Sequence, residues 1–389
     1  MMTKKDNGIY KRGNTWTAHI HWTDIHGTTQ QHKRGGFPTR QEALRYRTQY
    51  LADLQTGKRR GNSKLKLGDF LVHHWLPKRR NELKESTFAS YESTINAYVL
   101  PHLGETRMDA LTPLRLEDYY RNLTLTGAKG KKLRQGQGLS AKSIQNIATI
   151  LNRAYRDAIR WELVSTNPVT VSLKPKREHF EQPHWKTSMA GEFLRRVKDD
   201  RLAAVWQLLV TTGCRRGELL GLRWCDVDLD AATITIRRTR VLAGRRVIVE
   251  TPKSAKSRRT IAIDQRTVRS LRRWQTKQAE ERLRIGSQWR DTEGHLVTEP
   301  DGALPNPNTF LRRFKALAKQ VGLPAIAVHG VRHTYITSAF DANLDESVIS
   351  DRAGHSDSRI TRNVYRHTLK RKDAEAAEAV ANAFYEGTG

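Results

Sequence analysis

Two short segments of this 389-residue chain place arginine where it can meet an oxyanion. Residues 212–218 read Thr-Gly-Cys-Arg-Arg-Gly-Glu, so a glycine precedes a predicted helix start and Arg215 stands three residues before Glu218 on one helical face. Later, His329 and Arg332 repeat that spacing. An arginine beside a helix N-terminus can bind phosphate through its charge and through oriented backbone N–H groups. Taken alone, each pair could also be an ordinary surface ion pair or a helix cap.

Other polar residues complete an ordered set. Residues 251–261 form a basic turn between two strand-like runs, which predicts Lys253 at the tip of a hairpin, with Lys256 in the same turn. A Gly-His pair ending at His355 follows the second arginine, and Tyr365 comes later. Singly, His355 and Tyr365 could be core side chains. The order Arg, Lys, His-x-x-Arg, Gly-His, Tyr is much harder to obtain by chance.

Three other kinds of site are disfavoured. The run 127–132 lacks the spacing of a phosphate-cradling loop and predicts a flexible loop. A magnesium site could use the acids after Trp224, but aspartate is an ordinary turn residue at such a helix-to-strand connection; these are Asp226, Asp228 and Asp230. The two cysteines have no companions at metal-ligand spacing, so neither zinc nor a disulfide framework is indicated; they are Cys214 and Cys225.

The net charge points to a large polyanion as partner. Lys and Arg number 69 against 40 Asp and Glu, which leaves +29, and the excess lies in all parts of the chain. This pattern is typical of a protein that contacts nucleic-acid phosphates repeatedly. A merely soluble cationic protein, or one bound to acidic lipid, is the alternative. No apolar run approaches the ~18 residues of a membrane span, and no signal peptide is evident, so we expect a cytoplasmic protein without membrane contact.

The elements that position these residues fall into three segments. In residues 1–60, apolar and polar residues alternate from Trp16 to Trp22, a partner strand covers 28–34, and Thr39 can cap a helix. A three-stranded sheet with one helix follows from this pattern. Such a sheet can lay a strand in a DNA groove, or it can be only a folding appendage.

Residues 64–170 are expected to be all helix. The clearest helix covers 141–161 after a Ser140 cap, and an earlier one covers 86–100 and stops at Pro101 and Gly104. A proline-rich boundary at 168–183 then leads to a mixed, mainly helical domain over 180–389 with a small antiparallel sheet, whose strands are expected at 233–236, 246–250 and 260–263. The predicted fold class is therefore multidomain α+β.

Taken together, these motifs resemble the tyrosine recombinases, and specifically the phage-type integrases. The resemblance covers nearly the whole chain: residues 1–60 resemble the arm-site DNA-binding domain, 64–170 the helical SAM-like core-binding domain, and 180–389 the catalytic domain with a C-terminal tail helix. The run Tyr98-Val-Leu-Pro-His-Leu-Gly104 is a recognisable mark of the second. The resemblance implies a recombinase that cuts and rejoins DNA through a 3′-phosphotyrosine, without metal, cofactor or ATP.

The resemblance also assigns roles. The site residues would be Arg215, Lys253, His329, Arg332, His355 and Tyr365, with Glu218 as a supporting acid. The two arginines would clamp the phosphate, the lysine would protonate the leaving oxygen, and the tyrosine would attack. Lys256 stays open as the active lysine. Arg216 should point away from the site because adjacent helical residues diverge by about 100°.

The implied partners are double-stranded DNA at core and arm attachment sites, three further copies in a homotetramer, and DNA-bending proteins or an excision factor. The tail helix near residues 373–384 could dock on its own subunit or on a neighbour. Two rival functions remain: relaxation of DNA as a type IB topoisomerase, and DNA binding by a non-catalytic regulator. Phage, plasmid and transposon origins are not distinguished by the sequence.

Overall fold

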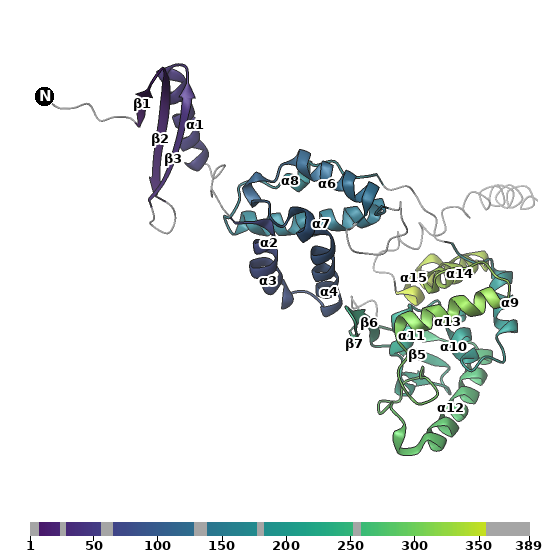
Figure 1. Ribbon diagram of the computed structural model, residues 1–389. Coiled ribbons are helices and arrows are strands. Elements are labelled where there is room, and N and C mark those ends of the chain that lie inside the picture. The colour runs from purple at the N-terminus through teal and green to yellow at the C-terminus, as the bar shows by residue number, and fades with distance from the viewer. Residues whose placement is uncertain are drawn as a thin grey trace, which may run out of the picture. The chain divides into compact units, whose positions relative to one another are not determined.

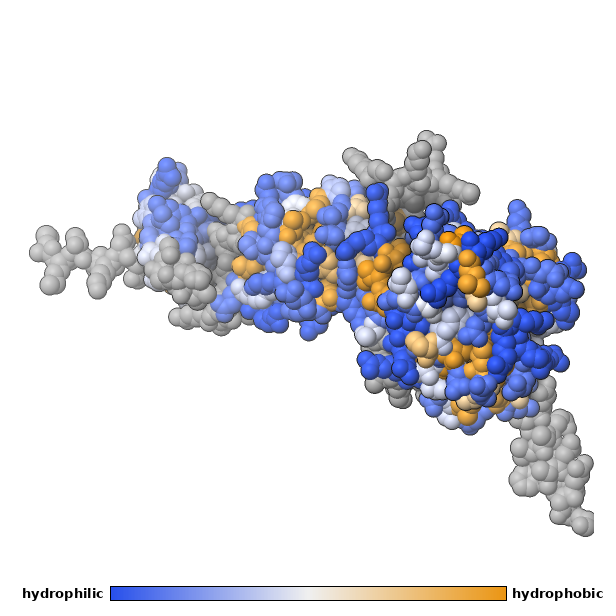
Figure 2. All heavy atoms as spheres, turned by 90° about the horizontal axis from the view of Figure 1, so that it is seen from below, coloured by the Kyte–Doolittle hydropathy of each residue, from blue (hydrophilic) through white to orange (hydrophobic). Residues whose placement is uncertain are grey.

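The computed structural model describes residues 8–23, 29–55, 65–127, 138–176, 183–251 and 258–354. The chain divides into two compact units, Met1–Glu178 and His179–Gly389, each considered by itself (Figure 1). In the described ranges no helix has the length and apolarity to cross a membrane. Hydrophilic side chains cover most of the described surface on the face drawn in Figure 2.

The first unit opens with a three-stranded antiparallel sheet in the order β1 (Ile9–Arg12), β2 (Thr15–Thr23), β3 (Thr29–Phe37), followed by α1 (Arg40–Gln55). Alternation along β2 buries Ala18 and Ile20 on the side facing α1. The Thr39 hydroxyl accepts a hydrogen bond from the Glu42 amide at 3.2 Å, which confirms the predicted cap.

The predicted end of the third strand at Arg34 is wrong. β3 continues to Phe37 because Gly35 and Gly36 form a bulge opposite β2. Gly36 has φ +87°, a conformation that glycine adopts without a steric penalty.

The other elements of the first unit, over its described residues, are helical, as predicted. They are α2 (Leu67–Asp69), η1 (Phe70–Trp75), α3 (Leu76–Arg80), α4 (Glu85–Thr94), η2 (Ile95–Val99), α5 (Leu100–Leu103), η3 (Met108–Ala110), α6 (Pro113–Thr126), α7 (Ala141–Arg160) and α8 (Pro168–Val171). The Ser140 side chain caps α7. The helix expected to stop at Pro101 and Gly104 runs past the proline and ends at Leu103, with Gly104 as its cap, and the turns just before the proline widen into the π-helix η2. Proline has no backbone N–H, so the regular helical hydrogen bond is missing at that position, and a π turn accommodates its absence.

The second unit is mixed and mainly helical. Its main elements are α9 (Thr187–Arg196), α10 (Ala203–Thr212), α11 (Arg216–Gly221), β4 (Val227–Asp228), β5 (Thr233–Ile236), β6 (Thr239–Ala243), β7 (Arg246–Glu250), β8 (Arg259–Ala262), α12 (Gln265–Ile285), α13 (Pro307–Gln320), α14 (Val328–Asp341) and α15 (Glu346–Ala353). Strands β4, β5 and β8 form one antiparallel sheet, and β6 and β7 form a separate hairpin.

The hairpin predicted around the basic turn is wrong. β7 pairs with β6 across a tight turn at Gly244, whose φ is +61°, and β8 pairs with β5. The sequence pattern did not predict β6, and β6 is the strand that pairs with β7 in place of β8. Residues 252–257 therefore connect two different sheets.

The core of the second unit is rich in aromatic side chains, and Trp185, Phe193, Trp206 and Phe314 are almost completely buried. This core packs α9, α10 and α13 together. A smaller apolar cluster, which includes Ile336 and Ile349, packs α15 against α14. The two clusters fix the helix ends that carry the polar residues described next.

Candidate active site

The first arginine lies at the junction of α10 and α11. α10 is capped by Gly213, which has φ +59° and whose position leaves no room for a Cβ beside the Tyr335 ring. Helix α11 begins at Arg216, so Arg215 is the residue just before the helix and not on its face as predicted. The Arg216 guanidinium points elsewhere and donates to the Pro307 carbonyl at 3.2 Å.

Glu218 organises this junction. Its carboxylate accepts the Arg215 amide at 2.8 Å and the Arg215 guanidinium Nη1 at 2.7 Å. It also accepts both terminal nitrogens of Arg259, at 3.2 and 3.0 Å. Its side chain is only 3% exposed. Burial by itself would raise the pKa of Glu218, but hydrogen bonds and charge from Arg259, together with Arg215, outweigh burial and lower it.

The second arginine, Arg332, is 1% exposed on α14. It donates from Nη1 to the Gly213 carbonyl at 3.0 Å and from Nη2 to the Ala353 carbonyl. Burial, and then repulsion by Arg215, lower the pKa of Arg332 to about 9. An anionic ligand next to Arg332 would favour the charged form of its guanidinium.

The end of α15 brings the arginines together. Three consecutive carbonyls accept from three arginines: Arg352 from Arg259 at 2.7 Å, Ala353 from Arg332, and Gly354 from Arg215 at 2.9 Å. The C-terminus of a helix carries a partial negative charge, which suits guanidinium donors. We call Arg215, Glu218, Arg259 and Arg332 the arginine cluster.

His329 stands in the first turn of α14 with an exposed side chain, one turn before Arg332. Its ring meets that of His333 edge to face, with centroids 5.0 Å apart. Burial, followed by the charges of His329, His184 and Arg332, lowers the pKa of His333 to about 4. His333 is therefore neutral at pH 7.

The structure thus brings Arg215, Glu218 and Arg332 into one cluster and sets His329 on the same helix as Arg332. The remaining predicted site residues lie outside the described residues; they are Lys253, its alternative Lys256, His355 and Tyr365.

Sequence reasoning missed Arg259 as a member of the cluster. The run 251–261 predicts a lysine for the site, but the second of its two adjacent arginines, Arg259, is the side chain that turns inward. A weak signal was available: Arg259 opens a strand, where alternate side chains face inward.

The three aspartates near Trp224 have other contacts. Asp226 pairs with Arg238 at 2.5 Å, and Asp228 accepts two amides of the following turn, at Asp230 and Ala231. Over the described ranges, no group of three or more His, Cys, Asp or Glu residues could hold a metal ion.

Comparisons with known proteins identify the family of the chain. The phage integrase family model matches residues 192–372, the phage integrase N-terminal SAM-like domain matches 68–124, and an arm DNA-binding domain matches 8–56. A tyrosine recombinase XerC-like protein of Caldanaerobacter subterraneus subsp. tengcongensis is 27% identical over 366 residues, which cover 89% of this chain and 90% of the relative.

Solved structures share the fold. The Tn1549 transposon integrase in complex with transposon right end DNA has a TM-score of 0.67 at 19% identity, covering 81% of this chain and 100% of that one. A lambda integrase tetramer bound to a Holliday junction has a TM-score of 0.51 at 17% identity, covering 92% and 97%. The chain belongs to the phage integrase family of tyrosine recombinases, enzymes of site-specific recombination that cut and rejoin DNA strands.

Proposed function

We propose that Arg215 and Arg332 bind the scissile phosphate of duplex DNA while Tyr365 attacks it. The observation that carries the proposal is the arginine cluster, in which two guanidiniums bond one carboxylate and three guanidiniums donate to the carbonyls of one helix end. Arg215 retains a side chain 39% exposed, so it can reach a ligand without leaving Glu218. Such a cluster is costly to assemble unless an anion binds it.

The chemistry of phosphoryl transfer fits these groups. Attack by a phenol creates a crowded pentavalent phosphorus with added charge on its non-bridging oxygens, and planar guanidiniums neutralise that charge. The phenol has an ordinary pKa near 10 and needs a base or a cationic setting, which His329 and the arginines would supply. His355 would donate a hydrogen bond to the phosphate.

The products explain how strands are exchanged. A positioned Lys253 would protonate the leaving 5′ oxygen, and a 3′-phosphotyrosine would retain the energy of the broken bond. A 5′ hydroxyl from another strand could then reverse the step and release the tyrosine. This sequence of steps would integrate and excise mobile DNA at attachment sites inside a bacterial cell.

In this proposal the chain works as three modules. Residues 1–60 would bind arm sites, 64–170 core sites, and 180–389 would hold the reacting phosphate. The three matched domains support that division, and the lambda integrase tetramer on a Holliday junction supports a homotetramer. DNA-bending proteins and an excision factor would set direction.

A covalent-adduct assay tests the reaction. The wild-type protein first selects duplexes from a random-sequence pool, and the selected duplex is then nicked at each successive position so that a cleaved fragment diffuses away. We expect a protein–DNA adduct that survives denaturation. With Tyr365→Phe it should disappear while binding remains. An adduct that persists in this variant, or no wild-type adduct at any nick, refutes the mechanism; relaxation of a plasmid without recombination would indicate a topoisomerase.

The identity of the general acid can be tested on the same duplex. A sulfur in place of the 5′ bridging oxygen leaves as a thiolate, whose conjugate acid has a pKa near 8.5 and needs no proton donor. We expect the slow cleavage by Lys253→Ala to be restored by this substrate, and Lys256→Ala to be insensitive to it. The reverse pattern would assign the role to Lys256.

A further inference from the structure

The arginine cluster contains one member with no role in the proposed chemistry. The Arg259 side chain is 8% exposed and is held on two sides, by both carboxylate oxygens of Glu218 and by the Arg352 carbonyl. A guanidinium engaged in this way directs its donors into the protein and not toward a ligand. Its charge is nevertheless next to the groups that would bind phosphate.

Glu218 connects Arg259 to Arg215. One carboxylate oxygen, Oε1, accepts from both guanidiniums, at 2.7 Å from Arg215 and 3.2 Å from Arg259. The bidentate Arg259 pair fixes the plane of the carboxylate, and that plane fixes the direction of Arg215. Arg259 therefore sets the direction of Arg215, the side chain proposed to bind the phosphate, although Arg259 itself does not contact the phosphate.

Arg259 also contacts the chain just before His355. Gly354 lies against the guanidinium so closely that a Cβ there would be 2.7 Å from Arg259 Nη1. Gly354 has φ +63° and gives its carbonyl to Arg215. Contact with Arg259 thus defines where the chain leaves α15.

The position of Arg259 in the chain adds a second connection. It is the first residue of β8 and lies two residues after the segment 252–257, which carries Lys253 and Lys256. One buried side chain consequently anchors the chain on both sides of the site: where the lysine segment ends and where the His355 segment begins.

On the basis of the proposed function, we propose that Arg259 is a positioning residue for DNA cleavage, which orients Arg215 through Glu218 and anchors the segments that carry the candidate lysine and His355. It raises the rate of the chemical step and leaves DNA affinity nearly unchanged. Displacement of reacting groups by about 1 Å can cost about 100-fold in rate, which sets the expected scale.

The inference has a signature in pH. Glu218 faces the guanidiniums of Arg215, Arg259 and Arg332 and the Cys214 thiol. Removing Arg259 takes away hydrogen bonds and positive charge that offset the effect of burial on Glu218. The pKa of Glu218 then rises, and its carboxylate is protonated at higher pH. The acid limb of the cleavage-rate profile should then move to higher pH.

The experiment measures single-turnover adduct formation on the selected nicked duplex across pH, with affinity from anisotropy on the intact duplex. We expect Arg259→Gln to lower the rate by about 10- to 100-fold at unchanged affinity and to shift the acid limb upward. Arg259→Lys keeps the charge but cannot span both oxygens, so it should restore the limb and only part of the rate. The matched control, Arg258→Gln, removes the same charge at the exposed neighbour and should leave the limb in place.

A double-mutant cycle separates positioning from general destabilisation. If Arg259 acts through Glu218, Arg259→Gln should cost much less in a Glu218→Gln background than alone. Equal costs in both backgrounds, or an unmoved acid limb, overturn the inference. If Arg259→Gln does not fold, Arg259→Lys supplies the same cycle. No wild-type adduct would refute the proposed function itself, whereas a wild-type adduct with an unaffected Arg259→Gln refutes only this inference.

Discussion

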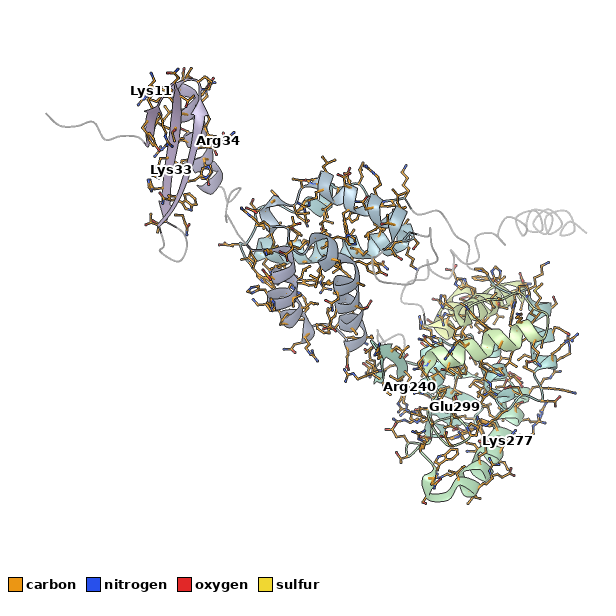
Figure 3. The ribbon with its side chains drawn as sticks, viewed as in Figure 1. Lys11, Lys33, Arg34, Arg240, Lys277 and Glu299 are labelled. Carbon is orange, nitrogen blue, oxygen red and sulfur yellow. The ribbon has the colours of Figure 1, made fainter. Side chains whose placement is uncertain are left out.

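Arginine and lysine occupy two contrasting settings in this molecule. In the arginine cluster the guanidiniums are fixed: Arg332 is 1% exposed and bonded to two carbonyls. On the N-terminal sheet the cationic side chains are exposed: Lys33 pairs in register with His19 of β2, on the face opposite that of Ala18 and Ile20 (Figure 3). The same charge is held rigidly in one region and left in water in the other.

The contrast separates two uses of cationic side chains. An exposed cation loses little on leaving water for a DNA phosphate, so it contributes affinity that salt screens. A buried guanidinium has already lost its water and is preorganised, so its interaction with developing charge is strong and directional. We therefore expect substitutions in the cluster to change rates and those on the sheet to change binding.

The largest effect is expected from a substitution in the arginine cluster. Arg332→Lys replaces a planar fork that bridges two carbonyls with a single ammonium. We expect the cleavage rate on the nicked duplex to fall by roughly 10²- to 10³-fold, the usual loss on removing one preorganised donor. Affinity, measured separately by anisotropy, should change far less. An equal loss in both would show that Arg332 serves mainly in binding.

A smaller effect is expected from the backbone that holds the cluster. Gly354→Ala adds a Cβ at φ +63° and 2.7 Å from Arg259, so it should strain the turn and displace the guanidinium. We expect roughly tenfold or greater slowing of cleavage, and about 1–3 kcal/mol lost from the free energy of unfolding.

Gly286→Ala provides the control for Gly354→Ala. Its φ is +62°, yet no atom lies within 4 Å of the new Cβ. The two variants should share the backbone strain, and only Gly354→Ala should slow cleavage. Matched slowing in both would assign the effect to strain alone.

The smallest effect is expected from substitutions on the N-terminal sheet. Lys33→Ala should lower the slope of log affinity against log salt by about one and leave the rate at saturating DNA unchanged. Arg34 is adjacent in sequence but faces α1, with its guanidinium 4.7 Å from the Tyr46 ring centre. Arg34→Ala should reduce melting temperature more than salt dependence. A salt slope that falls equally in both would mean that the two faces bind DNA alike.

Much of this architecture could be predicted from the sequence because it depends on local patterns. Alternation gave β2, and a serine cap located α7. The pairing of β7 with β6 could not be predicted, since strand partners depend on contacts remote in sequence. Of the site, the spacing of Arg215, Glu218 and Arg332 was readable, but the bond from Arg259 to Glu218 spans 41 residues and leaves no local signal.

The end of α15 has a consequence for hydrogen exchange. The Gly354 amide bonds to the Asp351 carbonyl in the same turn whose carbonyls receive three guanidiniums. Fraying of that one turn would take a carbonyl partner from all three arginines at once and leave Arg215 and Arg259 on Glu218 and Arg332 on the Gly213 carbonyl. The protection factor of the Gly354 amide should therefore report how often this turn, which holds one partner of each arginine, opens before any DNA is added.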